Sequence, residues 1–252
     1  TGSSGGPTGN TLTGWNFVIY DSQGNQVDSG TTSAENAGAP NDLGIRVTFN
    51  GLSPSETYTV CEIEQAGWIN SEPGTLDGTY NVPCKTLDAS GINNFAIMYF
   101  GNYEEPQPDL TAVKVNDTNG TGFVGAPFNW TITLANDGLG EATFADGEVI
   151  FRDNLPNGAT YYPFPDTSNL NNLIGGFDCM INTNVLTCVA LGSLTFQPGG
   201  SFDVSVQAAP TATGDLVNPT DGECTIDPDD EIVESNEDNN SCSDTVTVTE
   251  PS

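Results

Sequence analysis

The chain has 252 residues, of which 34 are acidic and 4 basic, with no histidine and a formal net charge of −30. Proteins bind phosphate groups through Lys and Arg, so this balance excludes nucleic acid as a partner and disfavours anionic membrane surfaces. No apolar run approaches the roughly 20 residues that cross a bilayer, so no membrane insertion is expected. We interpret the acidic surface as a solvating coat, with Ca²⁺ binding or a high-salt habitat as alternatives.

Length and turn composition predict an all-β protein of two domains. The 29 Gly and 16 Pro residues are typical of short strands separated by turns. We expect two tandem β-sandwich domains, immunoglobulin-like or prealbumin-like, joined by a short Pro-containing linker. Two prolines make that linker a semi-rigid spacer. The expected boundaries are an N-terminal lead at 1–12, a first domain at 13–103, the linker at 104–108 and a second domain at 109–252.

The first domain is expected to contain short alternating strands with turns between them. The predicted strands are Trp15–Tyr20, Val27–Thr31, Ile45–Phe49, Thr57–Ile63 and a buried closing strand at Phe95–Phe100.

Several motifs of this domain match one family. They are Gly14–Phe17 (GWNF), Asn50–Glu62 (NGLSPSETYTVCE), Gly67-Trp68 and Phe100–Asn102. In this order the region resembles the prealbumin-like B-repeat modules of bacterial surface adhesins, the Cna-B and SdrD B-type. The resemblance implies a structural stalk. Some members carry a Lys–Asn isopeptide bond from a lysine on the first strand, but Trp15–Tyr20 has no lysine. A Cys61–Cys84 disulfide is therefore expected as the substitute cross-link.

The second domain is predicted to contain about eight strands, a number and spacing that fit an immunoglobulin-like sandwich. They are Asp109–Val115, Phe128–Ala135, Glu148–Asp153, Ala159–Tyr162, a Phe177–Asn182/Val185–Leu191 hairpin, Ser201–Gln207, Gly222–Ile226 and Cys242–Thr249.

This domain resembles the tandem conserved-repeat domains of bacterial and archaeal surface proteins, which are similar to CARDB adhesion-like domains. The matching stretches are Asp109–Val115 (DLTAVKV), Trp130–Gly138 (WTITLANDG), Asp153–Pro156 (DNLP), Leu194–Ser201 (LTFQPGGS) and Glu234–Ser241 (ESNEDNNS). The resemblance implies a role in stalks, fibres or adhesive repeats.

The six cysteines are expected to form disulfides, because the chain lacks the histidines and CxxC pairs of most zinc sites. Disulfides imply an extracellular location, a secreted filament or a cell surface. Two cysteines precede the linker and four follow it. The predicted hairpin places Cys179 opposite Cys188 as a non-hydrogen-bonded pair, the closer kind. The expected pairs are Cys61–Cys84, Cys179–Cys188 and Cys224–Cys242.

Lys114 is one of only four basic residues, and strand alternation places it on the inward face with Leu110 and Ala112. A lone buried ammonium is costly and tends to lose its proton. A neutral lysine beside an Asn carboxamide and a carboxylic acid forms an isopeptide bond in related surface domains. Asp153 is the candidate acid, and Asn239 or Asn240 the candidate acceptor. In the alternative, Lys114 extends to solvent or pairs with Asp153.

The acidic loop at 227–240 is a candidate Ca²⁺ site, because Ca²⁺ takes six to eight oxygen ligands. The candidate ligands are Asp227, Asp229, Asp230 and Glu231. Since the loop lacks EF-hand spacing and most charge runs are solvated, a solvated loop is the alternative.

Four Asn-X-Ser/Thr sequons provide candidate glycosylation sites, at Asn116, Asn119, Asn129 and Asn239. Such sequons are also frequent by chance in a chain rich in Asn and Thr. Among the tryptophans, Trp15 and Trp130 lie in strand patterns and are expected in the core rather than stacked on sugars.

These observations together favour a structural protein over an enzyme. Without histidine and free cysteine the chain lacks the commonest catalytic bases and nucleophiles, and no catalytic motif is present. We expect a subunit of a prokaryotic surface fibre, pilus-like filament or stalk. The alternative is an adhesin or carbohydrate-binding module, which would need an exposed aromatic platform or an ordered Ca²⁺.

Polymerisation is the partner prediction. The sequence shows no signal peptide and begins with a Gly- and Ser-rich stretch, as expected of a processed form or a fragment. The lead at 1–12 and an alternating strand at Thr245–Thr249 favour strand addition between copies. A head-to-tail homopolymer is therefore expected.

Overall fold

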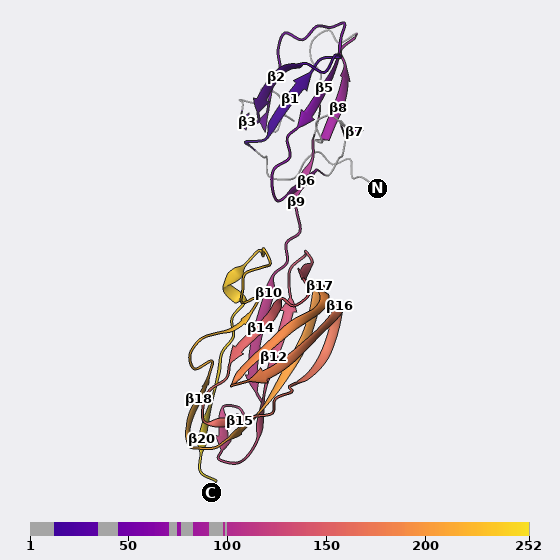
Figure 1. The fold of residues 1–252 in the computed structure, drawn as a ribbon. Helices are drawn as coiled ribbons and strands as arrows, with labels where there is room; N and C mark the ends of the chain where they lie inside the picture. The colour runs from indigo at the N-terminus through magenta and orange to yellow at the C-terminus, as the bar shows by residue number, and fades with distance from the viewer. Residues whose placement is uncertain are drawn as a thin grey trace. The chain divides into compact units, whose positions relative to one another are not determined.

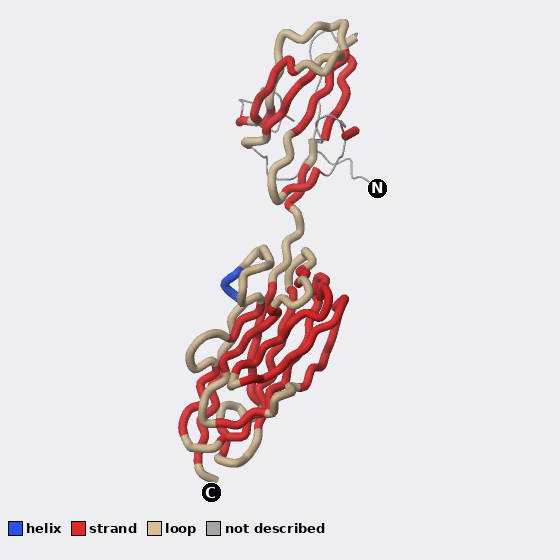
Figure 2. The backbone as a smooth tube through the Cα atoms, in the orientation of Figure 1, coloured by secondary structure: helices blue, strands red, loops and turns tan. Residues whose placement is uncertain are grey.

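The computed structural model describes residues 13–34, 45–70, 75–76, 83–90, 98 and 100–251. The chain divides into two compact units, Thr1–Glu105 and Pro106–Ser252, and each is described by itself (Figure 1). The all-β prediction is confirmed: within the described residues the only helical element is a short 3₁₀ turn, η1 (Glu237–Asn239) (Figure 2). The predicted lead at 1–12 lies outside these residues, as does most of the predicted Phe95–Phe100 strand.

The first unit is built on a five-stranded antiparallel sheet with the order β2-β1-β5-β8-β7. Its strands are β1 (Asn16–Tyr20), β2 (Gln26–Thr31), β5 (Thr57–Glu62), β7 (Thr75–Leu76) and β8 (Pro83–Asp88). Two small ladders accompany it: β3 (Ser33–Ala34) with β4 (Ile45–Arg46), and β6 (Trp68–Asn70) with β9 (Asn102–Glu104). Alternation along β1 buries Phe17 and Ile19 beneath Trp15, which meets Trp68 edge to face at 5.5 Å.

The second unit contains an eight-stranded sheet and a three-stranded sheet. The larger sheet holds β10 (Leu110–Asn116), β12 (Phe128–Asn136), β13 (Ala142–Phe144), β14 (Val149–Asn154), β15 (Ala159–Tyr161), β16 (Asp166–Asn182), β17 (Val185–Pro210) and β19 (Cys224–Ile226). The smaller sheet holds β11 (Thr121–Phe123), β18 (Gly214–Asn218) and β20 (Asp244–Thr249). Large apolar side chains fill one core, with Trp130, Phe144 and Phe196 fully buried.

One long strand organises the larger sheet. β17 runs for 26 residues, and β12, β13, β14, β15 and β16 all pair with it (Figure 1). The sequence predicted two separate strands here, at Val185–Leu191 and Ser201–Gln207, with a break between them. The structure instead carries the strand through this stretch, because successive segments of β17 find different partners. Pairing with several partner strands, which local sequence does not encode, therefore decides the length of β17.

The predicted linker at 104–108 is not a free spacer. Glu104 is the last residue of β9, and the Glu105 amide donates to the Gly67 carbonyl at 2.8 Å within the first unit. In the second unit the Gln107 carbonyl accepts from Leu139 at 3.0 Å. A Cβ at Gly140 would clash with the Pro106 carbonyl, so this close approach requires glycine. The five residues therefore belong to the two units, and the boundary falls between positions 105 and 106.

The C-terminal strand is already paired on both sides. β20 lies between β11, to which it is parallel, and β18, to which it is antiparallel. The predicted availability of Thr245–Thr249 for a neighbouring copy is therefore wrong, because both of its edges are occupied within the unit.

Candidate functional site

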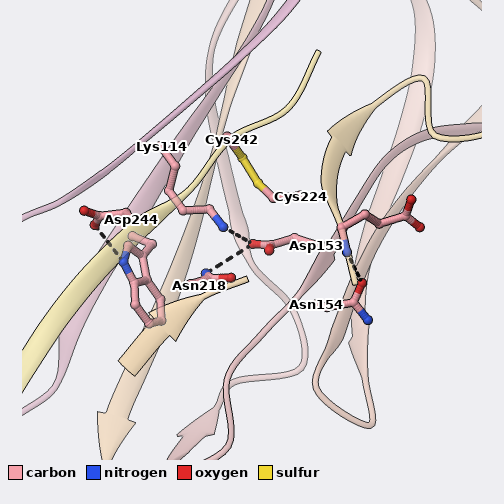
Figure 3. The surroundings of a disulfide bond; sticks show 9 residues. Lys114, Asp153, Asn154, Asn218, Cys224, Cys242 and Asp244 are labelled. Carbon is pink, nitrogen blue, oxygen red and sulfur yellow. Dashed lines mark hydrogen bonds and ion pairs between the residues drawn. A yellow bond between two sulfur atoms is a disulfide. The ribbon is translucent and has the colours of Figure 1, made fainter. Parts of the chain in front are cut away.

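Three buried polar side chains meet in the core of the second unit: Lys114, Asp153 and Asn218 (Figure 3). β10 carries Lys114 on its inward face, where it is 6 % exposed, as strand alternation predicts. Asp153 on β14 and Asn218 at the end of β18 are both 0 % exposed. Because β18 belongs to the smaller sheet, the cluster links the two sheets across the core.

The Asp153 carboxylate is the centre of this cluster. The Lys114 ammonium lies 2.8 Å from Asp153 Oδ2, and Asn218 Nδ2 donates to the same oxygen at 3.4 Å (Figure 3). In the described part of the chain, Asp153 Oδ1 and Asn218 Oδ1 have no hydrogen-bond partner. Buried polar atoms are rarely left unpaired, so two in one cluster mark a site that the fold alone does not explain.

Burial drives both ionisable groups towards their neutral forms. Desolvation lowers the pKa of Lys114, although the attraction of Asp153 partly opposes it. Desolvation likewise raises the pKa of Asp153 against the opposing effect of Lys114. A proton can therefore pass from the ammonium to the carboxylate, which leaves a neutral amine beside a carboxylic acid. A desolvated lysine of this kind is a nucleophile.

The cluster has the groups required for amide exchange. Lys114 Nζ would form a bond to Cγ of Asn218 as the bond from Cγ to Nδ2 breaks. The Lys114 nitrogen would give up one of its two protons as this bond forms, and Asp153 would relay a proton from it to the departing nitrogen, which leaves as ammonia. The product is an amide between Lys114 and Asn218, and Asp153 ends the reaction in the protonation state in which it began it.

The acceptor predicted from the sequence is not at this site. Asn239 Nδ2 donates to Asp109 Oδ1 at 2.8 Å, and Asn240 Nδ2 donates to Glu234 Oε1 at 2.8 Å. Asn239 therefore holds the start of the domain, and Asn240 holds Glu234, whose other oxygen accepts from the Leu110 amide. The asparagine that contacts Asp153 is instead Asn218, and sequence reasoning missed it because β18 was not predicted. A short alternation in the sequence before Pro219 could have predicted this strand. Its two alternating residues, Leu216 and Asn218, are both buried in the structure.

The structure joins the six cysteines in the three expected pairs, Cys61–Cys84, Cys179–Cys188 and Cys224–Cys242. Cys61 and Cys84 face each other across β5 and β8 with 4.0 Å between their Cα atoms. Cys179 and Cys188 do so across β16 and β17 at 4.1 Å. The third disulfide joins β19 to the segment before β20 and lies beside the Lys114 cluster (Figure 3).

The first unit has its own buried carboxylate, Glu62, which is 2 % exposed. Asn70 Nδ2 donates to one of its oxygens at 2.6 Å, and Asn102 Nδ2 donates to the other at 2.7 Å. Burial raises the pKa of Glu62, while these two hydrogen bonds and the charge of Lys85 act in the opposite direction. The arrangement fastens β6 and β9 to β5.

The predicted Ca²⁺ ligands do not gather around one point. Both oxygens of Asp227 accept backbone hydrogen bonds, from Glu231 at 3.1 Å and from Ile232 at 2.8 Å. Asp229 lies 3.6 Å from the guanidinium of Arg152. Asp230 follows Asp227 in a turn closed by a backbone hydrogen bond. Among the described residues no group of three or more acidic or cysteine side chains is placed to hold a metal ion.

The four sequons differ in the availability of their amides. Asn116 Nδ2 donates to Asp244, Asn129 Nδ2 to Asp117, and Asn239 Nδ2 to Asp109. Asn119 is exposed and makes no side-chain hydrogen bond within the described part of the chain. Trp15 and Trp130 are in the core, at 4 % and 0 % exposed.

Comparisons with known proteins identify no family for this chain. The sequence matches no protein-family model, and no curated protein is similar to it. The resemblances to B-type repeats and to conserved-repeat domains therefore remain predictions. Among solved structures the chain is similar to the T6 backbone pilin of serotype M6 Streptococcus pyogenes, with 14 % identity and a TM-score of 0.29. The match covers 93 % of this chain and 61 % of the pilin chain. No helix in the described residues is long and apolar enough to span a membrane.

Proposed function

We propose that this chain is a structural subunit of an extracellular fibre or stalk, in which covalent cross-links protect each unit against mechanical unfolding. The observation that carries the proposal is the buried cluster of Lys114, Asp153 and Asn218, which has the groups for a spontaneous isopeptide bond. Three disulfides in a chain without free cysteines support an oxidising, extracellular location.

The position of the cluster along the chain suits resistance to force. Lys114 lies on the first strand of the second unit, and Asn218 pairs with Asp244 at the start of the last strand. A bond between Lys114 and Asn218 would carry tension past the 104 positions that separate them. The Cys224–Cys242 disulfide removes another 18 positions from the extensible chain. Only short segments near the ends of the unit would then be able to extend.

The proposed fibre is a head-to-tail homopolymer. The acidic surface, with its net charge of −30, would keep such a fibre solvated and separate from its neighbours. Strand addition between copies through the lead at 1–12 remains the proposed contact. We propose no catalytic role, because the cluster would consume its own groups in a single reaction.

Single-molecule stretching of the full chain tests this function. In the wild type the second unit should show no long extension step. Asn218→Ala, which removes the acceptor but retains the ion pair, should release the 104 positions between the two residues, except the 9 that the Cys179–Cys188 disulfide bypasses. At about 3.4 Å per residue the added length is roughly 320 Å. An equally long step in the wild type would overturn the mechanical proposal.

A further inference from the structure

The outward face of the larger sheet in the second unit is polar. Alternation along β12 and β17 buries Trp130, Ile132 and Val204 and turns their neighbours outward. The outward residues that face one another are Asn129 and Gln207, Thr131 and Ser205, and Thr133 and Asp203, with Asp166 and Ser168 of β16 alongside. This face is rich in groups that donate and accept hydrogen bonds.

Two exposed aromatic side chains border this polar face. Tyr162 and Phe164 are 63 % and 59 % exposed, and their ring centres lie 6.0 Å apart at an angle of 71°. Pro163 separates Tyr162 from Phe164 in the sequence. Its carbonyl accepts from the Ile181 amide at 2.9 Å, so the segment is tied to β16. The two rings directly follow β15 in the chain and form an aromatic corner, and exposed aromatic surface of this kind marks a binding site.

Two cavities meet at this corner. One, of about 110 Å³, is lined by both rings together with Asn129, Ser205 and Gln207. The other, of about 300 Å³, shares Phe164 and follows β16 to Gly175 and beyond. The larger volume is at the lower end of the range for ligand pockets. Together they offer a ligand an aromatic wall with a polar floor on one side.

Several polar groups around the corner are available to a ligand. The side chains of Asp166, Ser205 and Gln207 make no hydrogen bond within the part of the chain that the structure describes. Other groups of the face are held in place: Asp203 accepts from Thr133 at 2.7 Å and from Asn169 at 2.6 Å. The floor is therefore ordered and still has free donors and acceptors.

Charge limits the class of ligand. The second unit has two basic residues, of which Lys114 is buried and Arg152 pairs with Glu223 at 2.6 Å. Neither can neutralise an anion at the aromatic corner, whereas Asp166 and Asp203 would repel one. Uronic acid, sulfated and phosphorylated ligands are therefore disfavoured, and the neutral amide and hydroxyl groups of Asn129, Ser205 and Gln207 suit a neutral ligand rich in hydroxyl groups.

We propose that Tyr162, Phe164 and the polar floor of Asn129, Ser205 and Gln207 form a binding site for a neutral glycan. The C–H face of a pyranose ring packs on an aromatic ring, and its hydroxyl groups hydrogen-bond to amide, hydroxyl and carboxylate side chains. The aromatic wall gives the sugar one ring to stack on and a second ring at its edge, and the polar floor gives it hydrogen-bonding partners. This site is independent of the proposed cross-link.

The test uses the full chain in native gels that contain soluble neutral polysaccharides: hydroxyethyl cellulose, glucomannan, xylan or laminarin. The wild type should be retarded by at least one of them and not by polygalacturonate. Tyr162→Ala and Phe164→Ala should each weaken binding about fivefold, since a ring contributes of the order of 1 kcal/mol through its stacking. Phe123→Ala is the matched control, because Phe123 is 43 % exposed on β11 of the smaller sheet.

Three results would overturn the site. The first is no retardation by any neutral polysaccharide, and the second is retardation that both ring variants retain. The third concerns a second copy of the chain as occupant. If sedimentation showed that wild-type chains self-associate and that Phe164→Ala abolishes this, the corner would be a contact between copies. Circular dichroism of each variant should match the wild type, because both rings are on the surface.

Discussion

Glu62 in the first unit and Asp153 in the second are both buried carboxylates, and they have different partners. Glu62 accepts from two asparagine amides, at 2.6 Å and 2.7 Å, so each of its oxygens has a neutral donor. Asp153 has the Lys114 ammonium at 2.8 Å and one longer asparagine contact at 3.4 Å, both to the same oxygen. Glu62 is a satisfied hydrogen-bonding centre, whereas Asp153 keeps an unpaired oxygen beside an amine.

In the proposed reaction, the neighbours of a buried acid and not its burial alone decide whether it reacts. Burial raises the pKa of both carboxyl groups, so the acid alone does not distinguish them. The second unit differs in the neighbours of its acid. The Lys114 amine contacts Asp153, and the Asn218 carboxamide beside it has an unpaired carbonyl oxygen. In the first unit the Cys61–Cys84 disulfide, next to Glu62 in sequence, supplies a covalent link instead.

The largest expected effect comes from removing the acceptor of the second unit. Asn218→Ala should destabilise this unit by about 4–5 kcal/mol, the entropic value of a cross-link that closes a loop of about 100 residues. Hydrogen exchange, read separately in each unit during thermal denaturation, measures this loss of stability. The matched control, Asn102→Ala in the first unit, loses one hydrogen bond to Glu62 and should cost about 1–3 kcal/mol. Equal losses in the two units would contradict the distinction between them.

A second effect concerns the disulfide of the first unit. Cys61→Ala with Cys84→Ala should cost this unit about 3 kcal/mol, because the bridge closes a loop across 23 positions. Removing Cys179 and Cys188, which are 9 positions apart, should cost less. Urea denaturation of both double variants ranks them, and the reverse order would show that loop closure is not the main contribution.

The smallest effect is on the pH dependence of the first unit. Burial raises the pKa of Glu62 above its ordinary value of 4.5, so the folded state holds a proton that the unfolded state has released. The stabilisation from Glu62 is therefore complete below pH 4.5 and declines as the pH rises through the folded-state pKa. Glu62→Gln should remove this decline. Unfolding midpoints across pH 4–8 measure it, and parallel curves for variant and wild type would contradict it.

Part of the difference between the two units could be predicted from the sequence. Strand alternation placed Lys114 and Asp153 on inward faces, and hairpin register paired Cys179 with Cys188, because both features depend on a period of two residues. The role of Asn218 was not predicted from the sequence, because β18 is short and partly exposed. Its pairing with β20 defines the strand, and local sequence does not encode that contact. The aromatic corner was not predicted for a similar reason, since the exposure of Tyr162 and Phe164 depends on the surrounding strands.

The mass of the intact, oxidised chain tests the central claim most directly. We predict a mass below that of the sequence by the hydrogens of three disulfides and by one ammonia, with a cross-linked peptide that contains Lys114 and Asn218. The masses of Asn218→Ala and Asp153→Asn should show no loss of ammonia, whereas the mass of Glu62→Gln should still show it. A wild-type mass lowered by the disulfide hydrogens alone, or an unmodified peptide containing Lys114, would contradict the account.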